Sequence, residues 1–177
     1  SGTGNLSAMD EYIGYSGVGV FKQSGGTNTV SNGLWVGTNP DGSGSYELSG
    51  TGNLSAMDEY IGYSGVVGFF IQSGGTNTVS NGLRVGTNPD SYGDYELSGT
   101  GNLKAKFENI GVYGTGTFKQ TGGTNTITDS LSLGIYSGSS GTYELRGTGN
   151  LSAMDEYIGY SGTGTFVQTG GTNTVSN

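Results

Sequence analysis

The feature that most constrains this chain is an internal repeat of about 48 residues. The segment SGTGNLSAMDEYIGYSG begins at Ser1 and Ser49, and it recurs from Arg146 with Arg as its first residue. A diverged copy, SGTGNLKAKFENIGVYG, begins at Ser98. Repeats of this length indicate units that bury their apolar faces by stacking on one another. We therefore expect one continuous array over residues 1–177, divided into repeats 1–48, 49–97 and 98–145 and a partial repeat 146–177.

Each repeat divides again into two similar halves, or rungs, of about 24 residues. Residues 45–62 align with residues 20–37 without a gap, which places Phe21 over Tyr46 and Asn28 over Asn53. The same alignment gives an aromatic column that comprises Phe21, Tyr46, Phe70, Tyr95, Phe118, Tyr143 and Phe166. It also gives an asparagine column that comprises Asn5, Asn28, Asn53, Asn77, Asn102, Asn125, Asn150 and Asn173.

The spacing of these columns predicts an all-β fold, a single-stranded parallel β-solenoid with about 24 residues and three short strands per rung. Apolar and polar residues alternate in short runs such as Tyr46-Glu47-Leu48, which is typical of strands. Frequent glycine disfavours helices. All variation in rung length falls in one link, which contains the turn-forming segments NPDGSG and NPDSYG. A fixed register with one variable corner is what stacked rungs require.

Two columns are expected to face solvent. The first, comprising Lys22, Glu47, Ile71, Glu96, Lys119, Glu144 and Val167, brings no like charges together on adjacent rungs, which we interpret as a register signal. The second begins with the aromatic residues Tyr12, Trp35 and Tyr60 and continues with Arg84, a candidate cation–π partner. This stripe is interpreted either as a stabilising stack or as a surface for sugars or for packing between fibres.

The asparagine column predicts an amide ladder of the kind found in cross-β stacks, although simple corner turns are compatible with it. Leucine separates the glutamines of successive repeats, so inward glutamine amides would have to bond the backbone or water. One conflict remains within the alignment. Val30 falls over Ser55, whereas Leu54 and Ala56 have the character of core residues. A bulge in one of the two rung types would resolve it.

The residues needed for catalysis are scarce. The chain has no Cys and no His. Three acidic pairs recur, namely Asp10-Glu11, Asp58-Glu59 and Asp155-Glu156. The two members of each pair are strand neighbours and point to opposite faces, so a pair is poorly placed for acid–base catalysis. The first two pairs lie two rungs apart, a separation that would suit an inverting glycosidase, but an active site is a unique constellation rather than a repeated one. We expect that the protein is not an enzyme and that it has no cofactor.

Two ligands other than substrates, Ca²⁺ and ice, are compatible with parts of the sequence. The acidic columns could hold Ca²⁺, yet the GGxGxD nonapeptide of calcium-binding β-rolls is absent. Rows of Thr-x-Thr are similar to those of ice-binding solenoids. In the gapless alignment they occupy only alternate rungs, with Gly, Leu and Ser between them. These rows are Thr27/Thr29, Thr76/Thr78, Thr124/Thr126 and Thr172/Thr174.

The segment GTGTFxQTGGTNT, at residues 114–126 and 162–174, resembles the glycine-rich repeats of bacterial surface β-solenoids. These include autotransporter passenger-type repeats and surface proteins associated with a PEP-CTERM sorting signal. Neither the sorting signal nor an outer-membrane barrel occurs in this sequence. The resemblance implies an exported protein, at the cell surface or outside the cell, and right-handed winding.

These observations favour a structural protein, namely a stretch of an extracellular fibre, stalk or surface-layer filament. An adhesin or carbohydrate-binding module and an ice-binding solenoid are the alternatives. The expected partner is the protein itself, by continuous or end-to-end stacking, since both chain ends fall inside a repeat and show no polar cap. A polysaccharide is a second candidate. A formal net charge of −8 argues against nucleic acid, and no apolar run is long enough to insert into a membrane.

Overall fold

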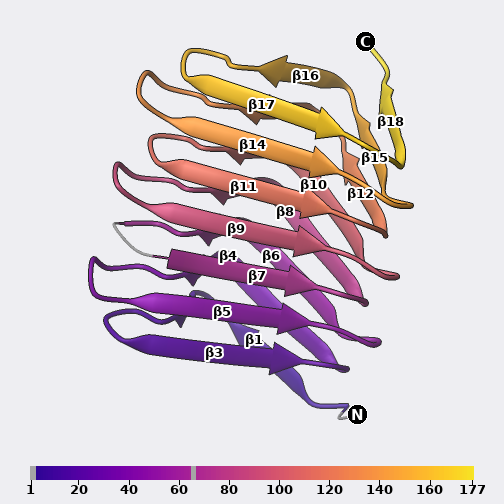
Figure 1. Ribbon diagram of the computed structural model, residues 1–177. Helices are drawn as coiled ribbons and strands as arrows, with labels where there is room; N and C mark the ends of the chain where they lie inside the picture. Colours follow the sequence, from indigo (N-terminus) through magenta and orange to yellow (C-terminus); the bar gives the residue numbers. More distant parts are fainter. Residues whose placement is uncertain (1–2, 65–66) are drawn as a thin grey trace.

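The structure is a computed structural model that describes residues 3–64 and 67–177 and contains strands but no helix in those ranges (Figure 1). Consequently no helix there is long and apolar enough to cross a membrane. Every strand pair is parallel, and the chain returns to the same two sheets on each rung. Tyr46 pairs with Phe70, its counterpart one rung later in the sequence. The predicted parallel β-solenoid is confirmed.

One sheet, called here the seven-stranded sheet, contains one strand from each full rung and faces the viewer in Figure 1. Its strands alternate between buried and more exposed residues, so Tyr46 and Leu48 point inward while Glu47 points outward. The strands are β3 (Val18–Gln23), β5 (Ser43–Leu48), β7 (Val67–Gln72), β9 (Tyr92–Leu97), β11 (Thr115–Gln120), β14 (Ser140–Leu145) and β17 (Thr163–Gln168).

The eleven-stranded sheet holds the rest of each rung. In the middle rungs, the second and third expected strands join into one long strand of nine or ten residues: β4 (Thr27–Val36), β6 (Asn53–Ile61), β8 (Thr76–Val85) and β10 (Asn102–Ile110). Elsewhere they stay separate, as β1 (Asn5–Ala8), β2 (Glu11–Ile13), β12 (Thr124–Ile127), β13 (Ser130–Leu133), β15 (Asn150–Ala153), β16 (Asp155–Ile158) and β18 (Thr172–Val175).

The register of the eleven-stranded sheet differs from the gapless alignment. Phe21 pairs with Tyr46, as expected, but Thr27 pairs with Asn53 and Asn28 with Leu54. One rung type therefore has an extra residue in the turn before this sheet. The register is restored further along, because the same rung type has one residue fewer between Ala56 and Asp58 than its neighbour has between Val30 and Gly33. The predicted bulge is confirmed, and it is one of two shifts that compensate each other.

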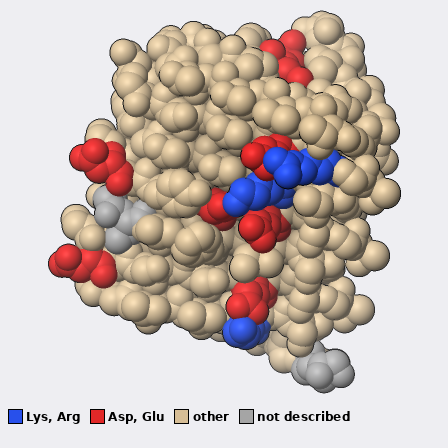
Figure 2. All heavy atoms as spheres, viewed as in Figure 1, with Lys and Arg blue, Asp and Glu red and all other residues tan. Residues whose placement is uncertain are grey.

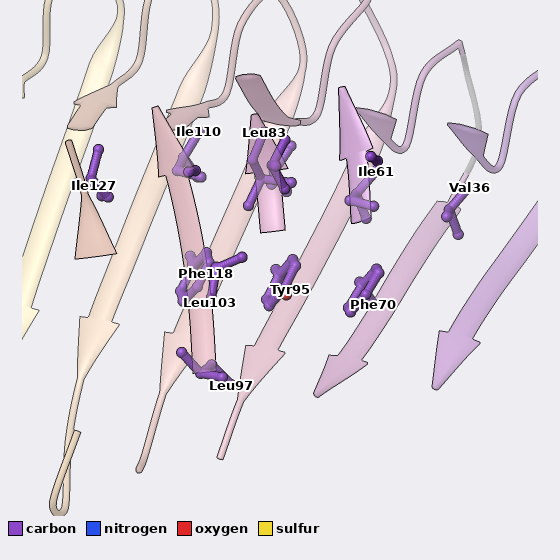
Figure 3. Close-up of a cluster of buried hydrophobic side chains, with 14 of the residues drawn as sticks. Val36, Ile61, Phe70, Leu83, Tyr95, Leu97, Leu103, Ile110, Phe118 and Ile127 are labelled. Atoms are coloured by element: carbon purple, nitrogen blue, oxygen red, sulfur yellow. The ribbon is translucent and has the colours of Figure 1, made fainter. Parts of the chain in front are cut away.

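The core is a single cluster enclosed by the two sheets, and its side chains lie in rows along the stack (Figure 3). At the corner where the two sheets meet, a column of glycines lets the backbones approach. A Cβ on Gly93 would overlap the carbonyl oxygen of Ile61 and the amide nitrogen of Gly86. Only glycine fits such an approach. The corner also contains the turns of variable length, such as the one closed by a hydrogen bond from Gly42 N to Asn39 O (2.8 Å).

Candidate functional site

The predicted aromatic column is an unbroken interior stack. Its ring centroids lie 4.6–5.3 Å apart, and the planes of the neighbours Tyr46 and Phe70 differ by 1°. Tyr46, Phe70, Tyr95, Phe118 and Tyr143 are fully buried. Figure 3 shows Phe70, Tyr95 and Phe118 in one row. Stacking continues through every rung because Phe and Tyr have the same ring footprint.

The predicted asparagine ladder is wrong. The register splits the expected column in two, because Asn53 pairs with Thr27 and Thr76, and Leu54 pairs with Asn28 and Asn77. The inward column contains Asn28, Asn77, Asn125 and Asn173, which alternate with Leu54, Leu103 and Leu151. The outward column contains Asn5, Asn53, Asn102 and Asn150, which alternate with Thr. No two asparagines are neighbours in either column, so no amide chain runs along the stack.

The inward asparagines instead belong to buried groups of four residues, which we call polar tetrads. In the central tetrad, Asn77 Nδ2 donates to Glu59 Oε2 and to the Tyr95 hydroxyl, at 3.1 Å each. The hydroxyl donates to Gln72 Oε1 at 2.7 Å, and Gln72 Nε2 donates to the backbone oxygens of Gly75 and Asn102. The inward glutamines thus bond the backbone, as predicted, and a tyrosine hydroxyl as well.

Within residues 3–64 and 67–177, the complete tetrad is built three times. The equivalent groups are Glu11, Asn28, Tyr46 and Gln23, and Glu108, Asn125, Tyr143 and Gln120. Each tetrad takes its Glu from one rung, its Asn and Gln from the next, and its Tyr from the third. The four residues come from both sheets, so each tetrad ties the two sheets together across the interior.

Burial of the glutamates was not predicted, although the sequence contains the signal for it. Leu34 pairs with Glu59, and Leu34 is a core position of its rung, so Glu59 must point inward as well. Burial raises the pKa of Glu59 and of Glu108 to about 8, against a weaker lowering effect of the hydrogen bond from asparagine. At neutral pH both carboxyls are therefore mainly protonated. Within the described residues, Glu59 Oε1 and Asn77 Oδ1 lack hydrogen-bond partners, and a neutral carboxyl reduces the cost of that burial.

The predicted aromatic stripe is also present, on the outside of the eleven-stranded sheet. Tyr12 and Trp35 stack at 4.8 Å, and Trp35 and Tyr60 at 5.4 Å. The Arg84 guanidinium lies over the Tyr60 ring at 5.1 Å and bonds Asp58 at 2.7 Å. Both faces of Trp35 and of Tyr60 are therefore covered by neighbours of the same stripe. A sugar ring that needs a free aromatic face cannot stack on these two residues.

The outward charge column lies in the predicted register, on the C-terminal halves of the strands of the seven-stranded sheet (Figure 2). Lys22 pairs with Glu47 at 2.8 Å, and Lys119 lies 3.7 Å from Glu96 and 2.7 Å from Asp94. The exposed pair of Lys22 and Glu47 contributes about 0–1 kcal/mol, whereas the Asp94 side chain that binds Lys119 is only 6% exposed. The polar tetrads, which are buried, are the stronger determinant of register.

The acidic pairs divide between the two sides of the sheet, as expected for strand neighbours. Glu59 points into the core, whereas Asp58 accepts hydrogen bonds from Asn81, Gly82 N and Arg84 on the outer side. In residues 3–64 and 67–177, no group of three or more His, Cys, Asp or Glu side chains is placed to hold a metal ion. Comparison with protein-family models, curated proteins and solved structures gives no match to this chain.

Proposed function

We propose that this chain is a structural element, a stiff β-solenoid segment of an extracellular fibre, stalk or surface filament. One observation carries the proposal: the same cross-section, with the same buried columns, repeats on every rung of the described chain. A cross-section of this kind can be lengthened by adding rungs without any change in its internal contacts. The tetrads repeat in the same way, which is expected of structural chemistry rather than of a single active site.

Stiffness follows from how the rungs are joined. Each interface between rungs combines two parallel strand ladders, a stacked aromatic pair and hydrogen bonds of a tetrad. Bending the rod would open these contacts on one side. The proposal therefore assigns the protein a role as a spacer or load-bearing filament, with no catalytic centre and no cofactor.

Electron microscopy with antibody labelling of cells that produce the protein tests this proposal. Labelled filaments, stalks or a surface layer would support it, whereas label confined to discrete particles inside the cell would refute it. A variant with residues 49–97 duplicated tests the rod geometry separately. Its length by small-angle X-ray scattering should increase by about 10 Å, because it gains two rungs at strand spacing.

Polysaccharide adhesion by exposed tyrosines beside the aromatic stripe is the second candidate. It is favoured by tyrosines that stand beside the stripe in edge-to-face pairs, such as Tyr12 with Tyr15 and Tyr157 with Tyr160. Tyr15 and Tyr160 are 56% and 63% exposed. Replacing both with Ala should abolish polysaccharide binding under this proposal. Binding that survives the double substitution would exclude the tyrosines as its source.

A further inference from the structure

A two-column array of small polar side chains runs along the outer side of the eleven-stranded sheet, where each rung enters that sheet. We call it the hydroxyl face. Its first column comprises Asn5, Thr27, Asn53, Thr76, Asn102, Thr124, Asn150 and Thr172. Its second comprises Ser7, Thr29, Ser55, Thr78, Lys104, Thr126, Ser152 and Thr174. Every rung thus presents either Thr-x-Thr or Asn-x-Ser, except the one with Lys104.

The register shift creates this array. In the gapless alignment, Thr29 falls over Leu54, and the rows of threonines are interrupted on every second rung. In the structure Thr29 pairs with Ser55, and Leu54 points into the core. Hydroxyl and amide groups therefore follow one another without an apolar side chain between them.

The hydroxyl face is exposed and its polar groups are largely unused. Its residues are exposed or half-buried, whereas the side chains between the two columns, such as Asn28 and Leu54, are buried in the core. In the part of the chain that the structure describes, Asn5 is the one residue of this face whose side chain makes a hydrogen bond, in which its Oδ1 accepts from Thr27 N. The threonine side chains are β-branched and so stiff at χ1, which holds their hydroxyls in fixed positions.

The geometry of the face is a two-dimensional grid. Neighbouring rungs are about 4.8 Å apart, and the two columns are about 6.7 Å apart along the strand. Both repeats are of the same order as those between oxygen atoms on a surface of ordinary ice. Hydroxyl and amide groups can both donate and accept hydrogen bonds, as water does.

We propose that the hydroxyl face binds ice. A protein partner that covered this face would displace water from many hydroxyl groups, and it would not replace every hydrogen bond that those groups make to water. An ice surface keeps those bonds, because the ligand is itself water. The near absence of charge, with Lys104 the one charged residue of the array, also argues against an ionic polymer. This inference depends on the register and not on the proposed structural role.

Thermal hysteresis and ice recrystallisation, measured with the purified chain, test the proposal. We expect the native chain to lower the freezing point below the melting point and to stop ice grains from growing. Thr78→Lys and Thr126→Lys together should abolish both effects, because they place charges in the array. Lys104→Thr should increase them, because it completes the second column.

Thr142→Lys is the matched control, since it makes the same change on the outside of the seven-stranded sheet. It should retain the activity of the native chain, and circular dichroism checks that all variants are folded. Absence of hysteresis in both the native chain and Lys104→Thr would refute the proposal. So would full activity in the double lysine variant. Binding to insoluble cellulose that is lost in the double variant, without any ice activity, would assign the face to a hydroxylated polymer and refute ice binding.

Discussion

The interior and the outer surface of this solenoid follow different rules. Inside, four columns alternate strictly from rung to rung: Phe with Tyr, Leu with Gln, Leu with Asn, and Leu with Glu. Outside, the aromatic stripe changes to Arg84, Asn109 and Ser132 after Tyr60, and Ile71 and Val167 interrupt the charge column. A slip by one rung would place each buried Tyr hydroxyl against apolar side chains, so the interior specifies the register. The hydroxyl face is an outer array that stays regular without such a need on every rung except the one with Lys104, which suggests a function of its own.

The largest effect is expected where the interior has no space. Gly93→Ala would drive a methyl group into the backbone of the preceding rungs, so the substitution should cost more than about 4 kcal/mol of the free energy of unfolding. Gly138→Ala is the control, because no heavy atom lies within 4 Å of the added Cβ and only its positive φ of 86° is strained. It should cost about 1–2 kcal/mol. Urea denaturation measures both, and equal costs would contradict the close approach at the corner.

Removing the centre of a tetrad should be the next largest effect. Asn77→Leu leaves the Glu59 carboxyl and the Tyr95 hydroxyl without their shared donor, at a cost of about 3 kcal/mol. Tyr95→Phe removes one hydroxyl and leaves the ring stack, so it should cost only about 1 kcal/mol. If Asn77→Leu left the free energy of unfolding unchanged in urea denaturation, the hydrogen bonds of the tetrad would not stabilise the fold, and the column in which Asn alternates with Leu would reflect side-chain packing alone.

The buried glutamates predict a stability that depends on pH. In the unfolded chain Glu59 loses its proton near the ordinary pKa of 4.5, whereas in the folded chain it keeps the proton up to a pKa of about 8. The folded state thus binds more protons between these values, so the free energy of unfolding falls as pH rises from 4.5, and the stabilising contribution is lost above 8.

We expect the native chain to lose about 2 kcal/mol or more between pH 5 and pH 9. The double variant Glu59→Gln, Glu108→Gln has no carboxyl to ionise at these two positions, so it should lose much less. Thermal unfolding followed by circular dichroism at several pH values measures both. A native chain whose stability rises over this range would contradict the burial of neutral carboxyls.

The smallest effect is expected on the outside. Glu47→Gln breaks the ion pair between Glu47, whose side chain is 37% exposed, and Lys22, whose side chain is 68% exposed. Because the pair is exposed, the substitution should cost less than about 1 kcal/mol of the free energy of unfolding. The same measurement in high salt should make the native chain and the variant equal. A cost as large as that of Asn77→Leu would mean that surface charge contributes as much to register as the tetrads do.

Much of this fold could be predicted from the sequence, because repetition exposes each column several times. The aromatic column was predicted correctly, since the segment from Phe21 to Gln23 has the same length in both rung types. The asparagine ladder was predicted wrongly, because the two register shifts of one residue cancel each other and therefore leave no gap in the alignment. Leu54 and Ala56 were the sign of this error, as they are apolar where the gapless alignment places them outside the core. The tetrads could not be predicted without the correct register, because they join three rungs across two sheets.

Disulfide cross-linking measures this register most directly, because the chain has no native cysteine. Thr29 and Ser55 are neighbours on the outside of the eleven-stranded sheet, within the Cα separation that a disulfide bridges. The double variant Thr29→Cys, Ser55→Cys should therefore form an intramolecular disulfide under mild oxidation, detected by mass spectrometry of its peptides. A Thr29→Cys, Leu54→Cys variant should remain reduced while folded, because its second thiol points into the core. Cross-linking of the Leu54 variant and not of the Ser55 variant would restore the gapless register and contradict both the tetrads and the hydroxyl face.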